Sequence, residues 1–281
     1  MDSFFLGRRR YPARGPTLVM GIVNVTPDSF SDGGRYLDPA AAILHGRQLV
    51  EAGADLLDVG GESTRPGSPG VDAACEQQRV LPVIEALART VDVPISIDTT
   101  KPEVARAALD AGATVINDVR GLRAGDELAR LAADRAASLI LMHSRGTPAD
   151  MQQQTHYDDL LGEVGAALGE AAETAMRAGV PRERLVLDPG IGFAKEAVDN
   201  LRLLNRLGRL VLLGYPVLVG PSRKAFLGKV TGLPVGERLM GTAAACVAAI
   251  LAGARLVRVH DVALLLPGIR VADAIREERI R

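Results

Sequence analysis

Residues 93–121 read VPISIDTTKPEVARAALDAGATVINDVRG, and this stretch decides the fold. It opens with the short apolar run VPISIDTT and closes with a second run, TVINDVRG. The segment between them, PEVARAALDAG, places small and apolar residues at helical spacing and ends at a glycine, which commonly stops a helix. A strand, a helix and a strand in succession predict two parallel strands joined by a right-handed crossover.

The same alternation extends in both directions along the chain. Longer segments rich in Ala, Leu, Glu and Arg separate eight short β-rich runs, which are LVMGIVNV, ADLLDVGG, VPISIDTT, TVINDVRG, SLILMHSR, RLVLDPG, YPVLVGPSRK and RLVRVHDV. Eight such units predict an α/β fold of the closed (β/α)8 TIM barrel type rather than an open sheet. No break in composition divides the chain, so we expect residues 17–281 to form one domain after a leader, residues 1–16.

Composition narrows the class of protein. The chain has 281 residues, of which 47% are hydrophobic and only 3% aromatic, so a large and mainly aliphatic core is expected. A net charge of −1 argues against nucleic-acid partners and anionic membrane surfaces. No apolar run reaches the length of about 18 residues expected of a membrane span. Cys75 and Cys246 fit two reduced thiols of a cytoplasmic protein better than a disulfide or a zinc site.

The leader reads MDSFFLGRRRYPARGP. Its apolar patch is short and precedes the basic residues, which is the reverse of a secretory signal peptide. Three consecutive arginines leave a targeting arm as an alternative. We expect instead a frayed segment that packs over one end of the domain.

Polar residues stand where the predicted strands end. In a parallel barrel all the carboxyl ends of the strands emerge on one face, where enzymes of this fold hold their sites. Caps of helices or loops explain individual residues such as Asp118, Asp126 and Asp158, but not a set that recurs at every strand. Buried charges also require a partner. The set consists of Asn24, Asp58, Asp98, Asn117, Asp118, His143, Asp188, Ser222, Arg223, Lys224, Arg258 and His260.

Strand periodicity groups some of these residues. Arg258 and His260 are two positions apart and therefore share one face of a strand, where they suit an anion such as phosphate. Ser222 and Lys224 have the same spacing. For Arg223 between them, an outward salt bridge and a functional role are equal alternatives.

Eight segments together resemble dihydropteroate synthase, in order from about Val19 to Asp273. The segments are NVTPDSFSDGG, DVGGESTRPG, ISIDT, INDV, MHSRGTPADMQ, DPGIGFAK, GPSRKAFLG and RVHDV. This family condenses (7,8-dihydropterin-6-yl)methyl diphosphate with 4-aminobenzoate to give 7,8-dihydropteroate and pyrophosphate in folate biosynthesis. The resemblance implies a transferase with a pterin-binding TIM barrel, a homodimer, Mg²⁺ as the cofactor and sulfonamides as inhibitors.

The resemblance also implies roles for individual residues. Pterin binding falls to Asp98, Asn117, Met142, Asp188, Phe193, Gly220 and Lys224. Diphosphate binding falls to Asn24, Thr64, Arg258 and His260, with Asn24 also a ligand of Mg²⁺. Aminobenzoate binding falls to Phe30, Thr64, Arg65, Pro66 and Ser222, carried partly by two mobile loops, NVTPDSFSDGG and GGESTRPGSPG. Catalysis falls to Asp98, Lys224, Arg258 and His260. Without the resemblance, ordinary core packing would be the preferred interpretation of Met142.

Two rival functions and one departure remain at this point. A pterin-dependent methyltransferase shares a related barrel, but the segments TRPG and SRK argue against it. An inactive pterin-binding paralogue is the second rival, although all the matched site positions are intact. The departure is ALLLPGIRVADAI, where Pro267 and Gly268 predict that the last helix begins only after them. We expect Leu264–Leu266 to pack beneath the barrel, with a subunit contact as the alternative.

Overall fold

The repeating units form one parallel sheet surrounded by helices. The computed structural model describes residues 1–26, 39–63, 67–68 and 70–280. Within these ranges the parallel strands are β3 (Leu18–Asn24), β4 (Leu56–Gly60), β5 (Ile95–Asp98), β6 (Val115–Asp118), β7 (Ser138–Met142), β8 (Leu185–Asp188), β9 (Leu218–Val219) and β10 (Leu256–Val259). They lie side by side in the order β8-β7-β6-β5-β4-β3-β10-β9.

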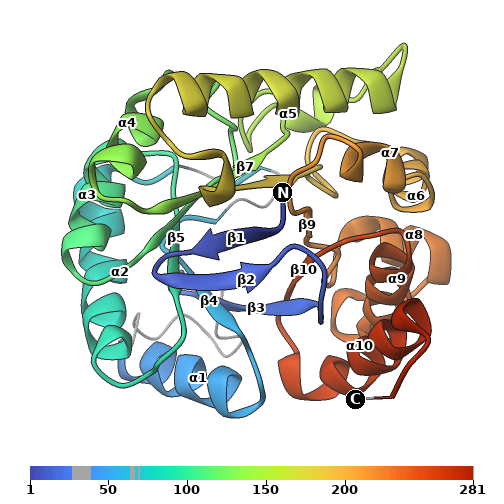
Figure 1. Ribbon diagram of the computed structural model, residues 1–281, viewed down its shortest axis with the longest axis horizontal. Helices are drawn as coiled ribbons and strands as arrows, with labels where there is room; N and C mark the ends of the chain where they lie inside the picture. The colour runs from blue at the N-terminus through green and yellow to red at the C-terminus, as the bar shows by residue number, and fades with distance from the viewer. Residues whose placement is uncertain (27–38, 64–66, 69, 281) are drawn as a thin grey trace.

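The sheet closes into a ring. A parallel bridge between Leu187 and Val217 joins β8 to the segment that leads into β9. The helices surround this ring (Figure 1), and the (β/α)8 barrel expected from the sequence is confirmed. The helices are α1 (Pro39–Glu51), α2 (Ala73–Ala88), α3 (Pro102–Asp110), α4 (Glu127–Asp134), α5 (Leu160–Arg177), α6 (Ala197–Asn205), α7 (Gly208–Val211), α8 (Ala225–Thr231), α9 (Leu239–Leu251) and α10 (Val262–Glu277), with 3-10 turns η1 (Met151–Gln153), η2 (Arg182–Arg184) and η3 (Val235–Glu237).

Side-chain caps fix two of the helix starts. Asp72 accepts a hydrogen bond from the backbone N of Cys75 at the start of α2, at 2.7 Å. Asp159, rather than its neighbour Asp158, caps α5 by accepting from the backbone N of Gly162. Each cap satisfies a backbone donor that the first helical turn leaves without a partner. None of the helices within the described ranges combines the length and the apolarity needed to cross a membrane.

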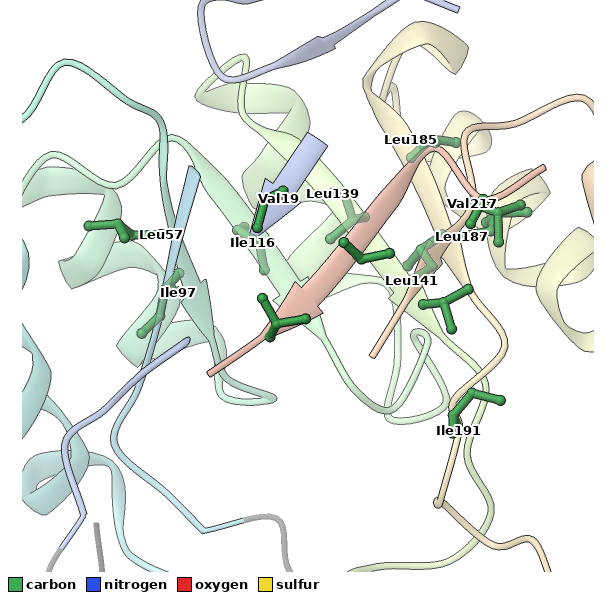
Figure 2. Packing of buried hydrophobic residues seen from close by; sticks show 14 of the residues in the cluster. Val19, Leu57, Ile97, Ile116, Leu139, Leu141, Leu185, Leu187, Ile191 and Val217 are labelled. Atoms are coloured by element: carbon green, nitrogen blue, oxygen red, sulfur yellow. The ribbon is translucent and has the colours of Figure 1, made fainter. Parts of the chain in front are cut away.

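Alternate residues of each strand face opposite sides of the barrel wall. Outward residues such as Val19, Leu57 and Ile97 join one large apolar cluster with the helices, and Figure 2 shows members of this cluster on successive strands. Inward residues such as Met20 and Leu56 belong to a second cluster inside the barrel. This alternation follows from the two-residue period of a strand. It also fixes which strand-end residues point into the barrel mouth.

The leader is folded. Within it, β1 (Ser3–Leu6) and β2 (Arg9–Pro12) form an antiparallel hairpin that lies across the centre of the ring (Figure 1). Phe4 and Leu6 are fully buried and join the inward cluster. The leader packs over one end of the domain, as expected, but it is not frayed, because its short apolar patch fills the end of the barrel opposite the strand carboxyl ends.

The last helix begins earlier than the sequence predicts. Helix α10 starts at Val262 and contains Pro267, so the expected start after Gly268 was wrong. Proline lacks an N–H and leaves the carbonyl of Ala263 without its helical donor. Both residues are exposed, so water can reach that carbonyl.

The expectation for Leu264–Leu266 holds in part. Leu265 is buried and Leu266 packs against the main core, whereas Leu264 is exposed on the outer face of α10.

Candidate active site

Side chains from neighbouring strands converge at the carboxyl end of the barrel. Asp98, the last residue of β5, pairs in register with Asn117 of β6. Met142 of β7 pairs with Asp188 of β8. Asn117, Met142 and Asp188 each lie two residues beyond an inward member of the same strand, and Asp98 shares the level of Asn117, so all four occupy inward positions. The structure therefore brings together residues that the motifs scatter over about a third of the sequence.

Arg258 links two acidic residues inside this mouth. Its Nε donates to Oδ2 of Asp58 at 2.6 Å, and its Nη2 donates to Oδ2 of Asp98 at 3.0 Å. The amide nitrogen of Asn117 donates to the same Asp58 oxygen at 3.1 Å. Asp58 is fully buried and the Arg258 side chain is 20% exposed. The result is one connected polar network with Asp58 at its base.

Burial makes Asp98 a weak acid in this setting. Loss of hydration, followed by repulsion from Asp58, raises the pKa of Asp98 to about 7, although the positive charge of Arg258 opposes the shift. Asp98 is thus poised to change protonation state near neutral pH. Perturbed carboxylates of this kind cluster at functional sites.

Asp188 and Lys224 supply a second carboxylate and a cation. Burial raises the pKa of Asp188 to about 6, against a hydrogen bond of 2.7 Å from the backbone N of Gly190. Gly190 is required here, since a Cβ atom would lie 1.9 Å from the backbone oxygen of His143. Burial lowers the pKa of Lys224 to about 8. At neutral pH Lys224 still carries its charge in most molecules.

An apolar wall lines the same mouth. Met142 and Phe193 form a small cluster with Met151 and Ala194. The Nζ of Lys224 lies 4.0 Å from the centre of the Phe193 ring, a cation–π distance. A flat heterocycle with polar edges would find both an apolar face and charged groups here.

Ser222 and His260 are directly bonded. The Ser222 hydroxyl accepts from the backbone N of His260 at 3.2 Å and lies 2.9 Å from its Nδ1. Burial lowers the pKa of His260 to about 3, so its ring is neutral. The hydroxyl has a hydrogen that it can donate to Nδ1, and in that tautomer the ring hydrogen lies on Nε2. Nε2 is therefore a donor suited to an anion.

Arg223 faces away from this network. It forms a two-point ion pair with Asp261, with Nε–Oδ2 at 3.0 Å and Nη2–Oδ1 at 2.5 Å. Its φ of 59° is unusual for a non-glycine residue and turns it away from its neighbours Ser222 and Lys224. Of the two alternatives for Arg223, the structure shows the salt bridge.

The remaining expected residues divide into two groups. Asn24 ends β3 in register with Gly60, which in turn pairs with Asp98, so Asn24 lies at the level of the carboxylates. Gly220 follows β9 and sits beside Arg258. The other expected contacts lie outside the described residues, and these are Phe30, Thr64, Arg65 and Pro66.

The residues present fit Mg²⁺ only in a limited way. Asn24 offers one amide oxygen, and the described ranges contain no group of three or more His, Cys, Asp or Glu side chains that could hold a metal ion. Mg²⁺ in phosphate sites commonly takes one or two protein ligands and completes its shell with phosphate oxygens and water. The donor set therefore suits an ion that arrives with a diphosphate.

Some buried charged groups near the site have no role in the motif assignments. Lys195 Nζ lies 3.0 Å from Nδ1 of His143 and donates to the backbone oxygen of Phe193 at 2.9 Å. Burial lowers the pKa of Lys195 to about 7. Lys101 bonds Glu62 and the fully buried Glu76.

Asp58 also has no role in the motif assignments. Its inward position on β4 is the one sequence signal that could have indicated that it belongs to the polar network.

Comparisons with known proteins agree with this geometry. The family described as pterin binding enzyme matches residues 20–260. A dihydropteroate synthase from Synechocystis sp. is 49% identical over 260 residues, which cover 92% of this chain and 90% of the relative.

Two solved structures show the same fold. The dihydropteroate synthase of Xanthomonas albilineans in complex with 7,8-dihydropteroate has a TM-score of 0.87 at 44% identity, covering 98% of each chain. The Yersinia pestis dihydropteroate synthase with a sulfonamide drug has a TM-score of 0.91 at 40% identity, covering 98% of this chain and 99% of that one. The chain belongs to the dihydropteroate synthase family of pterin binding enzymes.

Proposed function

We propose that this barrel mouth condenses (7,8-dihydropterin-6-yl)methyl diphosphate with 4-aminobenzoate, giving 7,8-dihydropteroate and pyrophosphate. The observation that carries the proposal is the convergence of Asp98, Asn117 and Asp188 on one mouth whose wall holds Phe193 and Lys224. Family membership supports the same reaction.

The pterin half matches the mouth in its chemistry. A 2-amino-4-oxo ring has adjacent N–H donors, which carboxylates such as Asp188 accept, and a ring carbonyl, to which Lys224 can donate. Met142 and Phe193 provide the apolar faces between which the ring lies. A ring that lacks either of these polar edges would leave Asp188 or Lys224 buried without a hydrogen-bond partner. Recognition is therefore selective for the 2-amino-4-oxo ring.

The diphosphate half falls to residues on the other side of the mouth. Arg258 supplies fixed N–H donors and His260 supplies Nε2 as a neutral donor. We infer that Mg²⁺ is bound by Asn24 together with the diphosphate oxygens. When bound, Mg²⁺ would neutralise part of the negative charge of the departing pyrophosphate.

The reaction is a dissociative substitution at the exocyclic methylene carbon. The bond from this carbon to the diphosphate oxygen breaks, and its electron pair leaves with pyrophosphate. Arg258 and His260 stabilise that growing negative charge, while ionised Asp98 stabilises the positive charge left on the pterin. The amine of 4-aminobenzoate then forms the C–N bond and loses a proton. This amine is already nucleophilic, so the step needs no strong base.

Pyrophosphate release distinguishes this function from its rivals. We expect release only when both substrates are present, with Mg²⁺ increasing the rate. A pterin-dependent methyltransferase would instead require a corrinoid acceptor, and an inactive paralogue would bind pterin without releasing pyrophosphate. Absence of pyrophosphate release from folded protein with both substrates and Mg²⁺ would refute the proposal.

Three further properties are proposed with the function. Exposed apolar side chains on the packed helices α9 and α10, including Met240, Leu264 and Val271, support a homodimer. Analytical ultracentrifugation of Met240→Glu should then show dissociation of the dimer.

Sulfonamides, as analogues of 4-aminobenzoate, are expected to inhibit the reaction. The free thiols of Cys75 and Cys246 support a cytoplasmic location.

A further inference from the structure

We propose that Asp58 is a positioning residue for this site, whose single carboxylate orients Asn117 on the pterin side and Arg258 on the diphosphate side. This inference rests on the proposed function and deepens it. The motifs assign no substrate contact to Asp58.

Asp58 lies below the level at which substrate would bind. On β4 it pairs in register with Ser96, whereas Gly60, the next inward position, pairs with Asp98. Asp58 is fully buried, while the Asp98 side chain is 10% exposed. Asp58 therefore acts through the residues above it rather than by touching a ligand.

Its contact with Asn117 determines how that amide faces the mouth. The Asn117 atom 3.1 Å from Asp58 Oδ2 is the NH₂ nitrogen, which donates to that oxygen. A flipped amide would place two acceptor oxygens against each other. The carbonyl oxygen of Asn117 is therefore left to accept a hydrogen bond from elsewhere. An acceptor at this level is what the N–H donors of a pterin require.

Its contact with Arg258 fixes the plane of the guanidinium. Asp58 holds Nε at 2.6 Å, and Nη2 then reaches Asp98 at 3.0 Å. Among the residues that the structure describes, Nη1 has no hydrogen-bond partner. A guanidinium held at its root keeps its outer N–H groups in one orientation, which favours binding of a phosphate.

Only one of the two oxygens of Asp58 is used in these contacts. Oδ1 of Asp58 is buried and has no hydrogen-bond partner within the described ranges. A buried acceptor without a partner opposes folding. Orientation of two ligand groups accounts for an acid at this position.

Asp58→Ala tests the inference because it removes the one oxygen that accepts from both Asn117 and Arg258. Two probes separate the halves of the site, 6-hydroxymethyl-7,8-dihydropterin and inorganic pyrophosphate with Mg²⁺. We expect calorimetry to show an affinity loss of about tenfold or more for each probe. Asp273→Ala is the matched control. Asp273 is a buried acid bonded to Thr17 at the opposite end of the barrel, so both affinities should stay at wild-type values.

A double-mutant cycle separates positioning from a purely structural role. In an Asn117→Ala background, Asp58→Ala should cost less than about threefold in dihydropterin affinity, since the group that Asp58 orients is gone. Its effect on pyrophosphate should persist. Wild-type affinities in Asp58→Ala, or a full additive loss of dihydropterin affinity in the double variant, would overturn the inference.

A second measurement does not depend on the variants folding. In an atomic-resolution crystal structure of the wild type with 6-hydroxymethyl-7,8-dihydropterin, a ring N–H should donate to the Asn117 carbonyl. A ring in direct contact with Asp58, or one that accepts from the Asn117 nitrogen, contradicts the inference. Wild-type pyrophosphate release with both substrates tests the proposed function separately, because it does not depend on what Asp58 does.

Discussion

Nη2 of Arg258 donates a 3.0 Å hydrogen bond to Oδ2 of Asp98, although 160 residues separate the two in the chain. Barrel closure brings β10 within reach of the strand that carries Asp98. This ion pair lowers the pKa of Asp98, whereas burial and repulsion from Asp58 raise it. Substrate must therefore enter a site whose charges already interact with one another.

Asp98→Asn should fold normally and lose most turnover. The amide keeps the shape of the side chain but removes the negative charge that stabilises the cationic pterin. We expect kcat to fall by about 100-fold or more, the scale of losing one preorganised electrostatic group. Steady-state pyrophosphate release measures the effect, and circular dichroism confirms the fold. Turnover at the wild-type rate would refute the role of Asp98.

The same variant should become relatively more stable as pH rises. The pKa of Asp98 is raised on folding, so the native state binds more protons than the unfolded state between about pH 4 and pH 7. Wild-type stability is therefore lost over this interval, whereas the amide of the variant does not titrate. Urea unfolding at pH 5 and at pH 8 should show the stability difference shifting in favour of Asp98→Asn. A pH-independent difference would contradict the raised pKa.

Binding of 6-hydroxymethyl-7,8-dihydropterin should depend on pH in a bell shape. Asp98 and Asp188, with pKa values raised to about 7 and about 6, must lose their protons to accept from the ring. Lys224, with its pKa lowered to about 8, must keep its proton to donate. Affinity should rise from pH 5.5 to pH 7 and fall above about pH 8. Calorimetry across this range measures it, and a flat profile would count against these groups as ligands.

Ser222→Ala should weaken the diphosphate half of the site. Without the hydroxyl, Nδ1 of the His260 ring loses its hydrogen-bond partner, and the ring is less firmly oriented toward the anion. Loss of one oriented donor predicts a drop of about tenfold in pyrophosphate affinity with dihydropterin affinity unchanged. The matched control is Ser144→Ala, whose hydroxyl bonds only a neighbouring backbone oxygen, at 3.4 Å, within the described residues. Equal losses for both probes would argue against an orienting effect of the hydroxyl.

Phe4→Ala should destabilise the barrel and leave its chemistry intact. Phe4 is fully buried, stacks on Tyr11 with ring centres 5.8 Å apart and fills the end of the barrel remote from the site. Core truncations of this kind cost about 3–5 kcal/mol. Urea unfolding should show that loss, and kcat of the folded fraction should match the wild type. Unchanged stability would mean that the hairpin does not support the core.

Sequence reasoning succeeded where a local rule decides the outcome. Two-residue periodicity predicted that Arg258 and His260 share a face, and the order of strands placed Asp98 and Asn117 at one mouth. It failed where tertiary packing overrides local propensity. Pro267 lies inside α10 because its side of the helix faces water, and the leader forms β1 and β2 because Phe4 can enter the open end of the barrel.

The network beneath the site was beyond prediction for a different reason. Asp58 was visible as a polar residue in a buried strand, but its partners come from β6 and β10, and only the closed ring brings them together. Lys195 and His143 likewise meet across two strand ends. A single sequence shows which residues of a strand share a face. The contacts between distant strands depend on the register of the sheet and on barrel closure.

Calorimetric titration of 6-hydroxymethyl-7,8-dihydropterin into wild type, Asp188→Asn and Asp273→Asn tests the central claim most directly. The central claim is that residues at strand ends far apart in the chain form one pterin pocket. The wild type and Asp273→Asn should therefore bind one dihydropterin per chain with equal affinity. Asp188→Asn should lose about tenfold or more. Wild-type affinity in folded Asp188→Asn would contradict the account, because the pterin would then bind elsewhere.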